Sequence, residues 1–312
     1  MNAPPASPSP PVSLSHVVKR YGAVLAVDDI DLTAAPGEIL ALAGHNGAGK
    51  TTLFKLILGL AFPESGSVRV FGGSPTGGGA VAARRRIGFL PENVVFSGNM
   101  TGRELLGFYA RLKRVAPAQC DDLLVRVGLA DAASKRVRTY SKGMRQRLGL
   151  AQMLLGEPAL LLLDEPTTGL DPTSRQRFYE LVDERRSRGA TVVLCSHALA
   201  DIEGWADRIA LLQKGRLITS GTLEELRHRT DLPARIRFRA PPGSRPALRA
   251  AVGSLAAFRE INGRMIELAC PPERRAEVLR RIDMTGHVRD LEILMPRLED
   301  IYRFYQGDEA VK

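Results

Sequence analysis

A nine-residue glycine-rich loop, Gly44–Thr52, constrains this chain more than any other segment. It reads Gly-His-Asn-Gly-Ala-Gly-Lys-Thr-Thr and stands between the apolar run Glu38–Ala43 and the helical pattern Leu53–Leu58. A strand, a glycine-rich turn and a helix in this order cradle nucleotide phosphates with backbone N–H groups and a helix N-terminus. Lys50 is then predicted to reach the β- and γ-phosphates, and Thr51 to offer its hydroxyl to Mg²⁺. The alternative is a surface turn that ends in Lys-Thr by chance.

The composition is that of an ordinary globular protein. With 312 residues, the chain is long enough for two domains. No stretch reaches the roughly 18 to 20 apolar residues that a membrane-spanning helix needs. Residues 1–11 are rich in proline and serine and lack the basic and apolar regions of a signal peptide. We therefore expect a disordered tail at residues 1–11 and a chain that stays in the cytoplasm.

The charge and the cysteines argue against other classes of protein. The excess of ten positive charges is compatible with nucleic-acid binding, but no basic helix is interleaved with aromatic residues. A basic face near anionic lipid, or solubility alone, explains the charge as well. Cys120, Cys195 and Cys270 lie far apart and form no Cys-x-x-Cys pair, so neither a disulfide framework nor a metal clip is indicated. We expect no nucleic-acid partner.

Alternating strand and helix patterns predict an α/β fold with a mainly parallel sheet. Apolar runs bounded by turn residues predict strands at residues 12–22, 28–32, 38–43, 66–71, 87–90, 160–163, 191–195 and 209–212. From about residue 93 to 157 the pattern is helical, which predicts a helical insert in this core. Its first helix begins with a capping box from Thr101 to Glu104. That helix is expected to present one apolar face made of Leu105, Phe108, Tyr109 and Leu112.

The chain changes character after Gly221. A short helix at 222–226 and an arginine-rich linker at 227–234 separate a first domain, residues 12–226, from a second, residues 235–312. In the second domain the patterns predict strand 235–240, helix 246–256, strands 257–262 and 265–270 around an Asn262-Gly263 turn, helix 272–284, strand 287–294 and helix 297–306. Asn-Gly between two alternating runs is typical of a hairpin. The order βαββαβ is that of a small ferredoxin-like α+β unit.

Two acids directly follow one of the buried strands. Residues 160–163 are leucines, and Asp164 and Glu165 come next. The carboxyl ends of parallel strands are where ligands bind in open α/β sheets. Asp164 is predicted to hold Mg²⁺ through water, and Glu165 to polarise the attacking water as general base. Taken alone, an acid pair after a strand is also compatible with a surface turn.

The segment Tyr140–Gln146, called here the signature segment, predicts a second anion site. It reads Tyr-Ser-Lys-Gly-Met-Arg-Gln and precedes a helix expected at Arg145–Leu155. Ser141 and Gly143 would then face outward at a helix N-terminus, where phosphate binds. Because one phosphate already has its own loop in this chain, a second site indicates that two copies meet. Each would complete the nucleotide pocket of the other.

In these motifs the chain resembles the ATPase subunits of ABC transporters. The resemblance implies that Tyr21 stacks on adenine, that the crossing loop Thr168–Asp171 spans the dimer interface, and that His197 contacts the γ-phosphate. A lone histidine after an apolar strand would otherwise be interpreted as structural. The resemblance also implies ATP and Mg²⁺ as cofactors, with Lys50, Glu165 and His197 as catalytic residues. The implied nucleotide-binding residues are Tyr21, Gly44, Asn46, Gly47, Gly49, Lys50, Thr51, Thr52, Glu92, Ser141, Gly143 and Asp164.

Two positions depart from the commoner family pattern. The signature segment has Ser-Lys-Gly-Met where Ser-Gly-Gly-Gln is more usual, and Met144 cannot donate the hydrogen bonds of a glutamine. Glu92 follows Gly-Phe-Leu-Pro, where a glutamine is usual. An ionised carboxylate accepts hydrogen bonds but does not donate them, and it suits Mg²⁺. We assign Thr51, Glu92 and Asp164 to the Mg²⁺ ion.

Short stretches favour one branch of the family. Pro91–Phe96, Met100–Glu104 and Gly44–Asn46 resemble the ATPase of the transporter that matures nitrous oxide reductase, a copper-processing system. This resemblance implies a homodimer on the cytoplasmic face of the inner membrane, a separate membrane permease and a periplasmic accessory protein, with copper or a sulfur species as cargo. The sequence itself has no Cys, His or Met cluster with the spacing of copper ligands.

Three other interpretations compete with this one. The first keeps transport and changes the cargo, as in a drug or lipid exporter of the ABC-2 type. The second is a soluble ABC ATPase that acts on ribosomes or DNA, although such proteins usually carry two ATPase units or a long coiled coil. The third is a P-loop kinase in which Tyr140–Gln146 starts an ordinary helix. The kinase leaves the ordered series of motifs unexplained.

Overall fold

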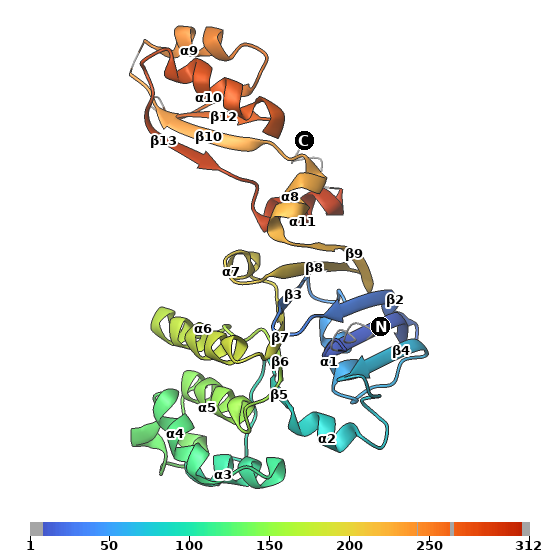
Figure 1. Cartoon of the computed structure of the whole chain (residues 1–312). Helices are drawn as coiled ribbons and strands as arrows, with labels where there is room; N and C mark the ends of the chain where they lie inside the picture. The colour runs from blue at the N-terminus through green and yellow to red at the C-terminus, as the bar shows by residue number, and fades with distance from the viewer. Residues whose placement is uncertain (1–8, 242, 263–264, 308–312) are drawn as a thin grey trace, which may run out of the picture. The chain divides into compact units, whose positions relative to one another are not determined.

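The computed structural model describes residues 9–241, 243–262 and 265–307, in two compact units that divide between Ser220 and Gly221 (Figure 1). Most of the predicted tail and the tip of the predicted Asn262-Gly263 turn lie outside the described residues. In the described ranges no helix is long and apolar enough to cross a membrane.

A six-stranded sheet forms the centre of the first unit. Its order is β5-β6-β7-β3-β8-β9, and the pairs from β5 to β8 are parallel, which confirms the predicted mainly parallel sheet. Helices α5 and α6 lie on one side of it and α1 on the other (Figure 1), so β3 and β6 are apolar and buried on both faces. The strands and helices named here are β3 (Ile39–Ala43), β5 (Ile87–Leu90), β6 (Leu160–Asp164), β7 (Thr191–Ser196), β8 (Arg208–Gln213), β9 (Arg216–Gly221), α1 (Lys50–Ile57), α5 (Lys142–Leu154) and α6 (Pro172–Ser187).

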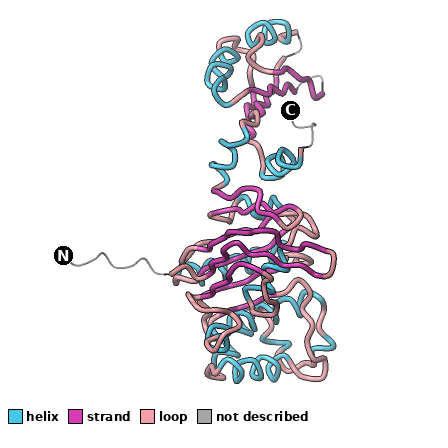
Figure 2. Tube along the Cα trace, turned by 90° about the vertical axis from the view of Figure 1, so that its right-hand side faces the viewer, coloured by secondary structure: helices cyan, strands magenta, loops and turns pink. Residues whose placement is uncertain are grey.

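A second, antiparallel sheet covers α1. The sequence predicted strands in this part of the chain but not their sheet, whose order is β2-β1-β4. Its strands are β1 (Val12–Tyr21), β2 (Val24–Ala34) and β4 (Ser65–Val70). Leu53, Phe54 and Leu56 of α1 are buried in one core with residues of both sheets. The helix that starts at the glycine-rich loop is therefore held on two sides. Figure 2 shows the strands (magenta) running side by side through the middle of this unit.

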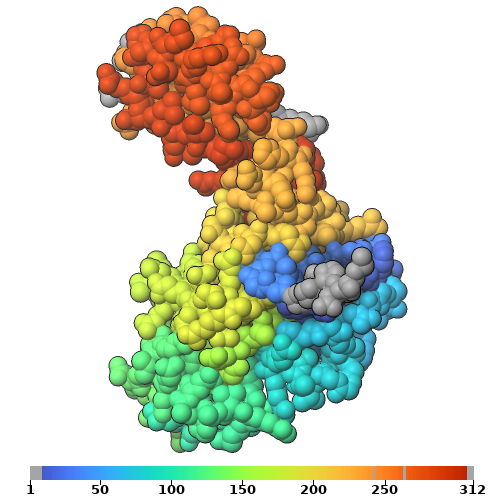
Figure 3. Space-filling model, viewed as in Figure 1, coloured from blue at the N-terminus to red at the C-terminus, as the bar shows by residue number. Residues whose placement is uncertain are grey.

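The predicted helical insert is present. It contains α3 (Gly102–Lys113), α4 (Ala118–Arg126) and α5, and Figure 3 shows it as a green lobe at the surface of the first unit. The capping box of α3 is confirmed, because the Thr101 hydroxyl accepts from the Glu104 amide at 3.2 Å and the Glu104 carboxylate accepts from the Thr101 amide at 2.8 Å.

The predicted apolar face of α3 is wrong in part. Leu105 is buried as expected, but Phe108 is 41% and Leu112 56% exposed. Leu106 and Ala110 are buried in their place. The reason is that α3 packs against both α4 and α5, so the buried stripe turns toward Leu106 and Ala110 and away from Phe108 and Leu112.

The second unit has the predicted ferredoxin-like elements. One antiparallel sheet of order β11-β12-β10-β13 shares a core with the helices α9 and α10. The elements are α8 (Leu223–Thr230), β10 (Ala234–Arg239), α9 (Arg245–Val252), β11 (Ala257–Asn262), β12 (Met265–Cys270), α10 (Arg275–Asp283), β13 (Arg289–Leu294) and α11 (Leu298–Gln306). Inward Ile236 and Phe238 alternate with outward arginines along β10, which is the pattern of a sheet covered on one face.

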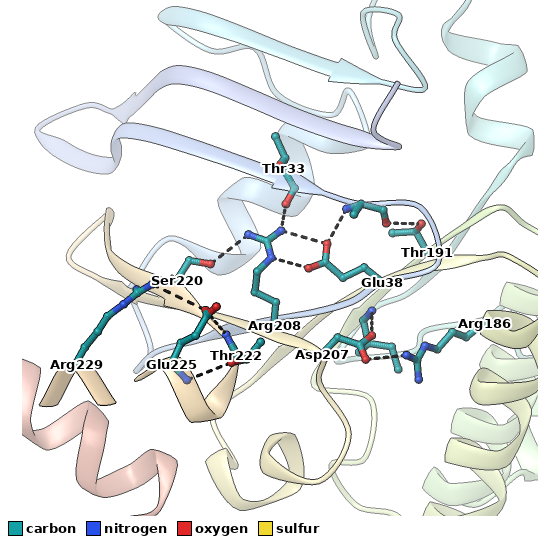
Figure 4. Close-up of polar contacts among 12 residues, drawn as sticks. Thr33, Glu38, Arg186, Thr191, Asp207, Arg208, Ser220, Thr222, Glu225 and Arg229 are labelled. Carbon is teal, nitrogen blue, oxygen red and sulfur yellow. Dashed lines mark hydrogen bonds and ion pairs between the residues drawn. The ribbon is translucent and has the colours of Figure 1, made fainter. Parts of the chain in front are cut away.

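A polar network ties together the amino-terminal edge of the central sheet (Figure 4). Arg208, the first residue of β8, donates to both carboxylate oxygens of Glu38, at 2.6 Å from Nε and 3.1 Å from Nη2. It also donates to the Thr33 carbonyl and, at 3.2 Å, to the Ser220 hydroxyl. The planar fork of an arginine suits such a set of acceptors. One side chain thus joins the β2–β3 turn, β8 and the end of β9, at the edge opposite the glycine-rich loop.

We predict that Glu38→Gln destabilises the first unit by about 2 kcal/mol, because it leaves the Arg208 guanidinium without its charged partner in a largely buried site. Differential scanning calorimetry of the full chain measures this as a lower melting temperature of one transition. Asp121→Asn is the control, since Asp121 pairs with Arg103 on the surface, where both side chains are more than half exposed. Equal shifts for the two variants would contradict the prediction.

Candidate functional site

The glycine-rich loop has a backbone that requires glycine at two positions. Gly49 has φ 106°, and a Cβ there would lie 2.6 Å from the Ala26 carbonyl oxygen. A Cβ on Gly44 would lie 2.5 Å from the Leu212 carbonyl oxygen. Among the described residues no side chain caps α1, so the N–H groups of its first turn are open to an anion. The loop therefore has the geometry of a phosphate cradle.

A cavity of about 210 Å³ brings the loop together with the predicted acids. The side chain of Lys50 is buried, and its amine donates to the carbonyls of Gly44 and His45, the latter at 3.3 Å. The cavity is lined by Val24, Ala26, residues 45–52, Glu92, Asp164 and Glu165. The carboxyl ends of β5 and β6 and the loop after β3 thus meet at one edge of the sheet, as the sequence predicted.

Three carboxylates and one ammonium group line this cavity. The pKa of Asp164 is raised to about 6, mainly by burial and then by the nearby charges of Glu165 and Glu92. Lys50 and a hydrogen bond from the Thr51 hydroxyl oppose this rise. The excess of negative charge and the oxygen ligands of Thr51, Glu92 and Asp164 fit a divalent cation such as Mg²⁺.

Glu165 is held in place by residues at the end of β7. Its backbone has φ 48°, a left-handed conformation that a glutamate adopts only when its surroundings hold it. Its amide donates to the Cys195 carbonyl at 3.0 Å. Its two carboxylate oxygens contact the Ser196 hydroxyl at 3.3 Å and His197 Nδ1 at 2.8 Å. The structure therefore brings His197 and Glu165 into direct contact, and it adds Ser196, which the sequence did not single out.

The predicted adenine contact lies beside the cavity and does not line it. Tyr21 ends β1, is 45% exposed, and has the Lys19 ammonium 5.1 Å from its ring centroid. Val24 and Ala26 of the next strand line the cavity instead. On this side, therefore, Val24 and Ala26 form the apolar rim of the cavity, whereas the sequence suggested Tyr21 alone.

No residue of the signature segment lines the cavity of its own chain. Ser141 is the N-cap of α5, and its hydroxyl accepts from the Met144 amide at 3.2 Å. A Cβ built on Gly143 would meet nothing within 4 Å, so the backbone there is open to a ligand. The crossing loop lies next to this segment, because a Cβ on Gly169 would lie 3.2 Å from Lys142 Cε. This placement is compatible with the prediction that the segment serves a second copy.

Comparison with known proteins decides the family. The profile of the family described as ABC transporter matches residues 27–168. The Daunorubicin resistance ATP-binding protein DrrA3 of Streptomyces coeruleorubidus is 35% identical over 96% of this chain and 96% of its own length. The chain belongs to the ATP-binding subunits of ABC transporters. Such ABC ATPases couple ATP hydrolysis to transport, form dimers and work with membrane permease components.

Other relatives of this ABC ATPase differ in length. ATP-binding cassette sub-family A member 7 of Rattus norvegicus is 33% identical over 91% of this chain, which spans 14% of that protein. Nod factor export ATP-binding protein I of Paraburkholderia xenovorans is 37% identical over 69% of this chain and 70% of its own length. A solved structure described as an ATP binding subunit of an ABC transporter is 31% identical, with a TM-score of 0.67 over 70% of this chain and 92% of its own length. This likeness confirms the predicted fold.

We predict that Asp164→Asn stabilises the nucleotide-free, Mg²⁺-free ABC ATPase at neutral pH. The raised pKa means that folded Asp164 keeps its proton up to about pH 6, whereas the unfolded side chain loses it near 3.8. This residue's contribution to stability therefore falls as the pH rises from about 4 to 6 and stays lost above that, at a cost of about 3 kcal/mol. The asparagine variant escapes this cost.

Thermal unfolding in EDTA at pH 5 and pH 7.5 measures the effect. The gain in melting temperature from Asp164→Asn is expected to be larger at pH 7.5, and adding Mg²⁺ is expected to stabilise the natural protein more than the variant. An equal gain at both pH values would show that Asp164 is ionised throughout, against the assignment.

Proposed function

We propose that this chain is the ATP-hydrolysing subunit of an exporter whose cargo is a hydrophobic small molecule such as a drug or a lipid. The observation that carries the proposal is the match to a daunorubicin resistance protein over 96% of both chains. A match of that extent includes most of the second unit, Gly221–Lys312. The Nod factor export relative supports the same direction of transport.

The copper-processing prediction gains no support from these relatives, none of which is described as a copper or nitrous oxide reductase protein. It rested on short stretches of the first unit, whereas the daunorubicin resistance match extends over nearly the whole chain. The periplasmic accessory protein belonged to the copper system alone and is not part of our proposal. The drug or lipid exporter is the alternative interpretation that these relatives support.

Nucleotide binding follows from the residues that line the cavity. The loop N–H groups from Gly47 to Thr52 and the Lys50 amine bind the β- and γ-phosphates of ATP. Tyr21, beside Val24, packs against adenine. Thr51, Glu92 and Asp164 would hold Mg²⁺, and the bound cation would neutralise phosphate charge. The negative charge of the carboxylates in the cavity then favours nucleotide binding, because it binds the cation that the nucleotide needs.

Hydrolysis requires a base aimed at water. The Glu165 carboxylate, held between the Ser196 hydroxyl and His197, accepts a proton from a water molecule as the water oxygen bonds to the γ-phosphorus. The bond from that phosphorus to the β–γ bridging oxygen breaks, which releases ADP and phosphate. His197 holds the carboxylate from the solvent side and contacts the γ-phosphate.

Two copies pair head-to-tail in this proposal. Ser141 and Gly143 of one copy bind the γ-phosphate that Lys50 and Thr51 of the other copy hold, because the open amides at the start of α5 offer the complementary positive charge. Hydrolysis removes the charge that bridges the two copies, which then separate.

Exposed apolar side chains mark a surface for the permease. Val95 is 85%, Phe108 41% and Leu112 56% exposed. They lie on the segment that follows Glu92 and on α3, and Tyr109 contacts both Phe96 and Phe108 at ring-centroid distances of 6.3 and 5.5 Å. We propose that this apolar surface docks the permease at the cytoplasmic face of the inner membrane, so that movement at Glu92 reaches the cargo path.

We predict that Glu165→Gln traps an ATP-bound dimer, because the amide cannot accept the proton of water while the phosphate contacts remain. Size-exclusion chromatography with ATP and Mg²⁺ is expected to show a dimer for the variant and a steady-state mixture for the natural chain. The double variant Lys50→Ala, Glu165→Gln is the control and is expected to stay monomeric. A monomer for Glu165→Gln in ATP would contradict the composite site.

Resistance assays in cells test the cargo. We predict that coexpression of this chain with its membrane permease raises the tolerance of a drug-sensitive host to anthracyclines, and that Glu165→Gln abolishes the gain. Cargo-stimulated ATPase activity of the purified complex, with anthracycline and with copper in parallel, measures the same preference in vitro. Stimulation by copper alone would overturn the exporter proposal and restore the copper-processing system.

A further inference from the structure

A buried glutamine near the ATP site has no part in the nucleotide binding described above. Gln146 lies on α5 and is only 6% exposed. Its side-chain Nε2 donates to the Pro166 carbonyl at 3.2 Å. Pro166 is the residue directly after Glu165, so the amide of Gln146 holds the turn that carries the catalytic acid.

The same turn is held from a second direction. The Thr167 hydroxyl, 7% exposed as a residue, donates to Asp201 Oδ2 at 3.3 Å. Asp201 lies on α7 (Leu199–Glu203), the short helix that begins two residues after His197, and it also pairs with Arg175 of α6 at 3.3 Å. The Glu165–Thr167 turn is therefore held by α5 from one direction, through Gln146, and by α7 from another, through Asp201, which is itself paired with α6.

The conformation of Glu165 gives these contacts a mechanical consequence. Its φ of 48° persists only because neighbouring groups determine it, and the Gln146 bond to the next residue is one of them. If α5 shifts along its axis, the bond pulls on the Pro166 carbonyl. The carboxylate of Glu165 then moves relative to Ser196 and His197.

The two ends of this connection serve different nucleotides. On our proposed function, Ser141 at the start of α5 binds the nucleotide held by the other copy, whereas Glu165 acts on the nucleotide of its own chain. Ser141 and Gln146 are five residues apart, about 7.5 Å along one rigid helix. We propose that Gln146 is a positioning residue that couples the two ATP sites of the dimer. Nucleotide binding at one site, through Ser141, positions the Glu165 carboxylate at the other site.

The test is the variant Gln146→Met, which keeps the length of the side chain and removes its donor. In the full chain, the affinity for ATP measured with Mg²⁺-ATP on the monomer is expected to stay within about twofold of the natural value. The rate constant kcat is expected to fall about 10- to 100-fold, since a small misplacement of a base costs this much. The Hill coefficient for ATP hydrolysis is expected to fall from its natural value to one.

Gln176→Met is the matched control. Gln176 lies exposed on α6, and its amide donates to Glu180 at 3.0 Å, so the same substitution there is expected to leave kcat and the Hill coefficient unchanged. Should Gln146→Met fold poorly, Thr167→Val removes the second contact on the same turn at almost constant shape and is expected to lower the Hill coefficient too.

The outcomes separate this inference from the function it rests on. Gln146→Met with a lower melting temperature and a natural Hill coefficient would show a structural role only and overturn the coupling. A natural chain that hydrolyses ATP with a Hill coefficient of one would overturn it as well, leaving the ATPase intact. A natural chain without ATP hydrolysis or ATP-dependent dimers would instead contradict the proposed function itself.

Discussion

The burial of negative charge at the carboxyl edge of the central sheet is the constraint on which the rest of this structure depends. Asp164 and Glu165 are both 7% exposed, and Glu92 adds a third carboxylate to the same cavity. A buried charge is costly unless it is paired. One ammonium group, Lys50, does not balance three carboxylates, so the folded chain is prepared for a cation and, through it, for a polyphosphate. Burial first, and then the charges of Glu165 and Glu92, raise the pKa of Asp164.

The sheet makes this arrangement tolerable. β3 and β6 are buried on both faces. Because the core around them is closely packed, the positions of their ends are fixed. The polar network of Arg208 and Glu38 fixes the opposite edge of the same strands. Charges at one edge and a well-satisfied ion pair at the other divide the sheet into a reactive end and a stable end, as is general for sites in open α/β folds.

The parts of the site that could be predicted from the sequence are those encoded by neighbouring residues. The glycine-rich loop, the acids after β6 and the Thr101 capping box each need only a few consecutive positions, and the structure shows each of them. The elements of the second unit followed in the same way from alternation and turn residues. These patterns are local, so one sequence was enough to find them.

The parts that could not be predicted depend on contacts across the fold. Gln146 and Ser196 lie next to motifs that were recognised, but only the packing of α5 and β7 around Glu165 shows what they contact. The buried stripe of α3 was misplaced because its position is set by α4 and α5 together. Val24 and Ala26 gave no signal at all, since small apolar residues in an edge hairpin are common and reach the cavity only through the pairing of β2 with β1.

The identity of the cargo has to be sought away from the cavity. On the proposed function, the residues that line it serve the nucleotide, the cation or water, and this chemistry is the same whatever is transported. Differences between cargo systems must therefore enter through surfaces that contact other proteins, which here include the exposed Val95, Phe108 and Leu112. Apolar side chains at such exposure are costly in water unless a partner covers them. A permease whose cytoplasmic loops cover this surface would select this ATPase by shape, and the coupling of Gln146 to the base would then convert that selection into paired hydrolysis at both sites.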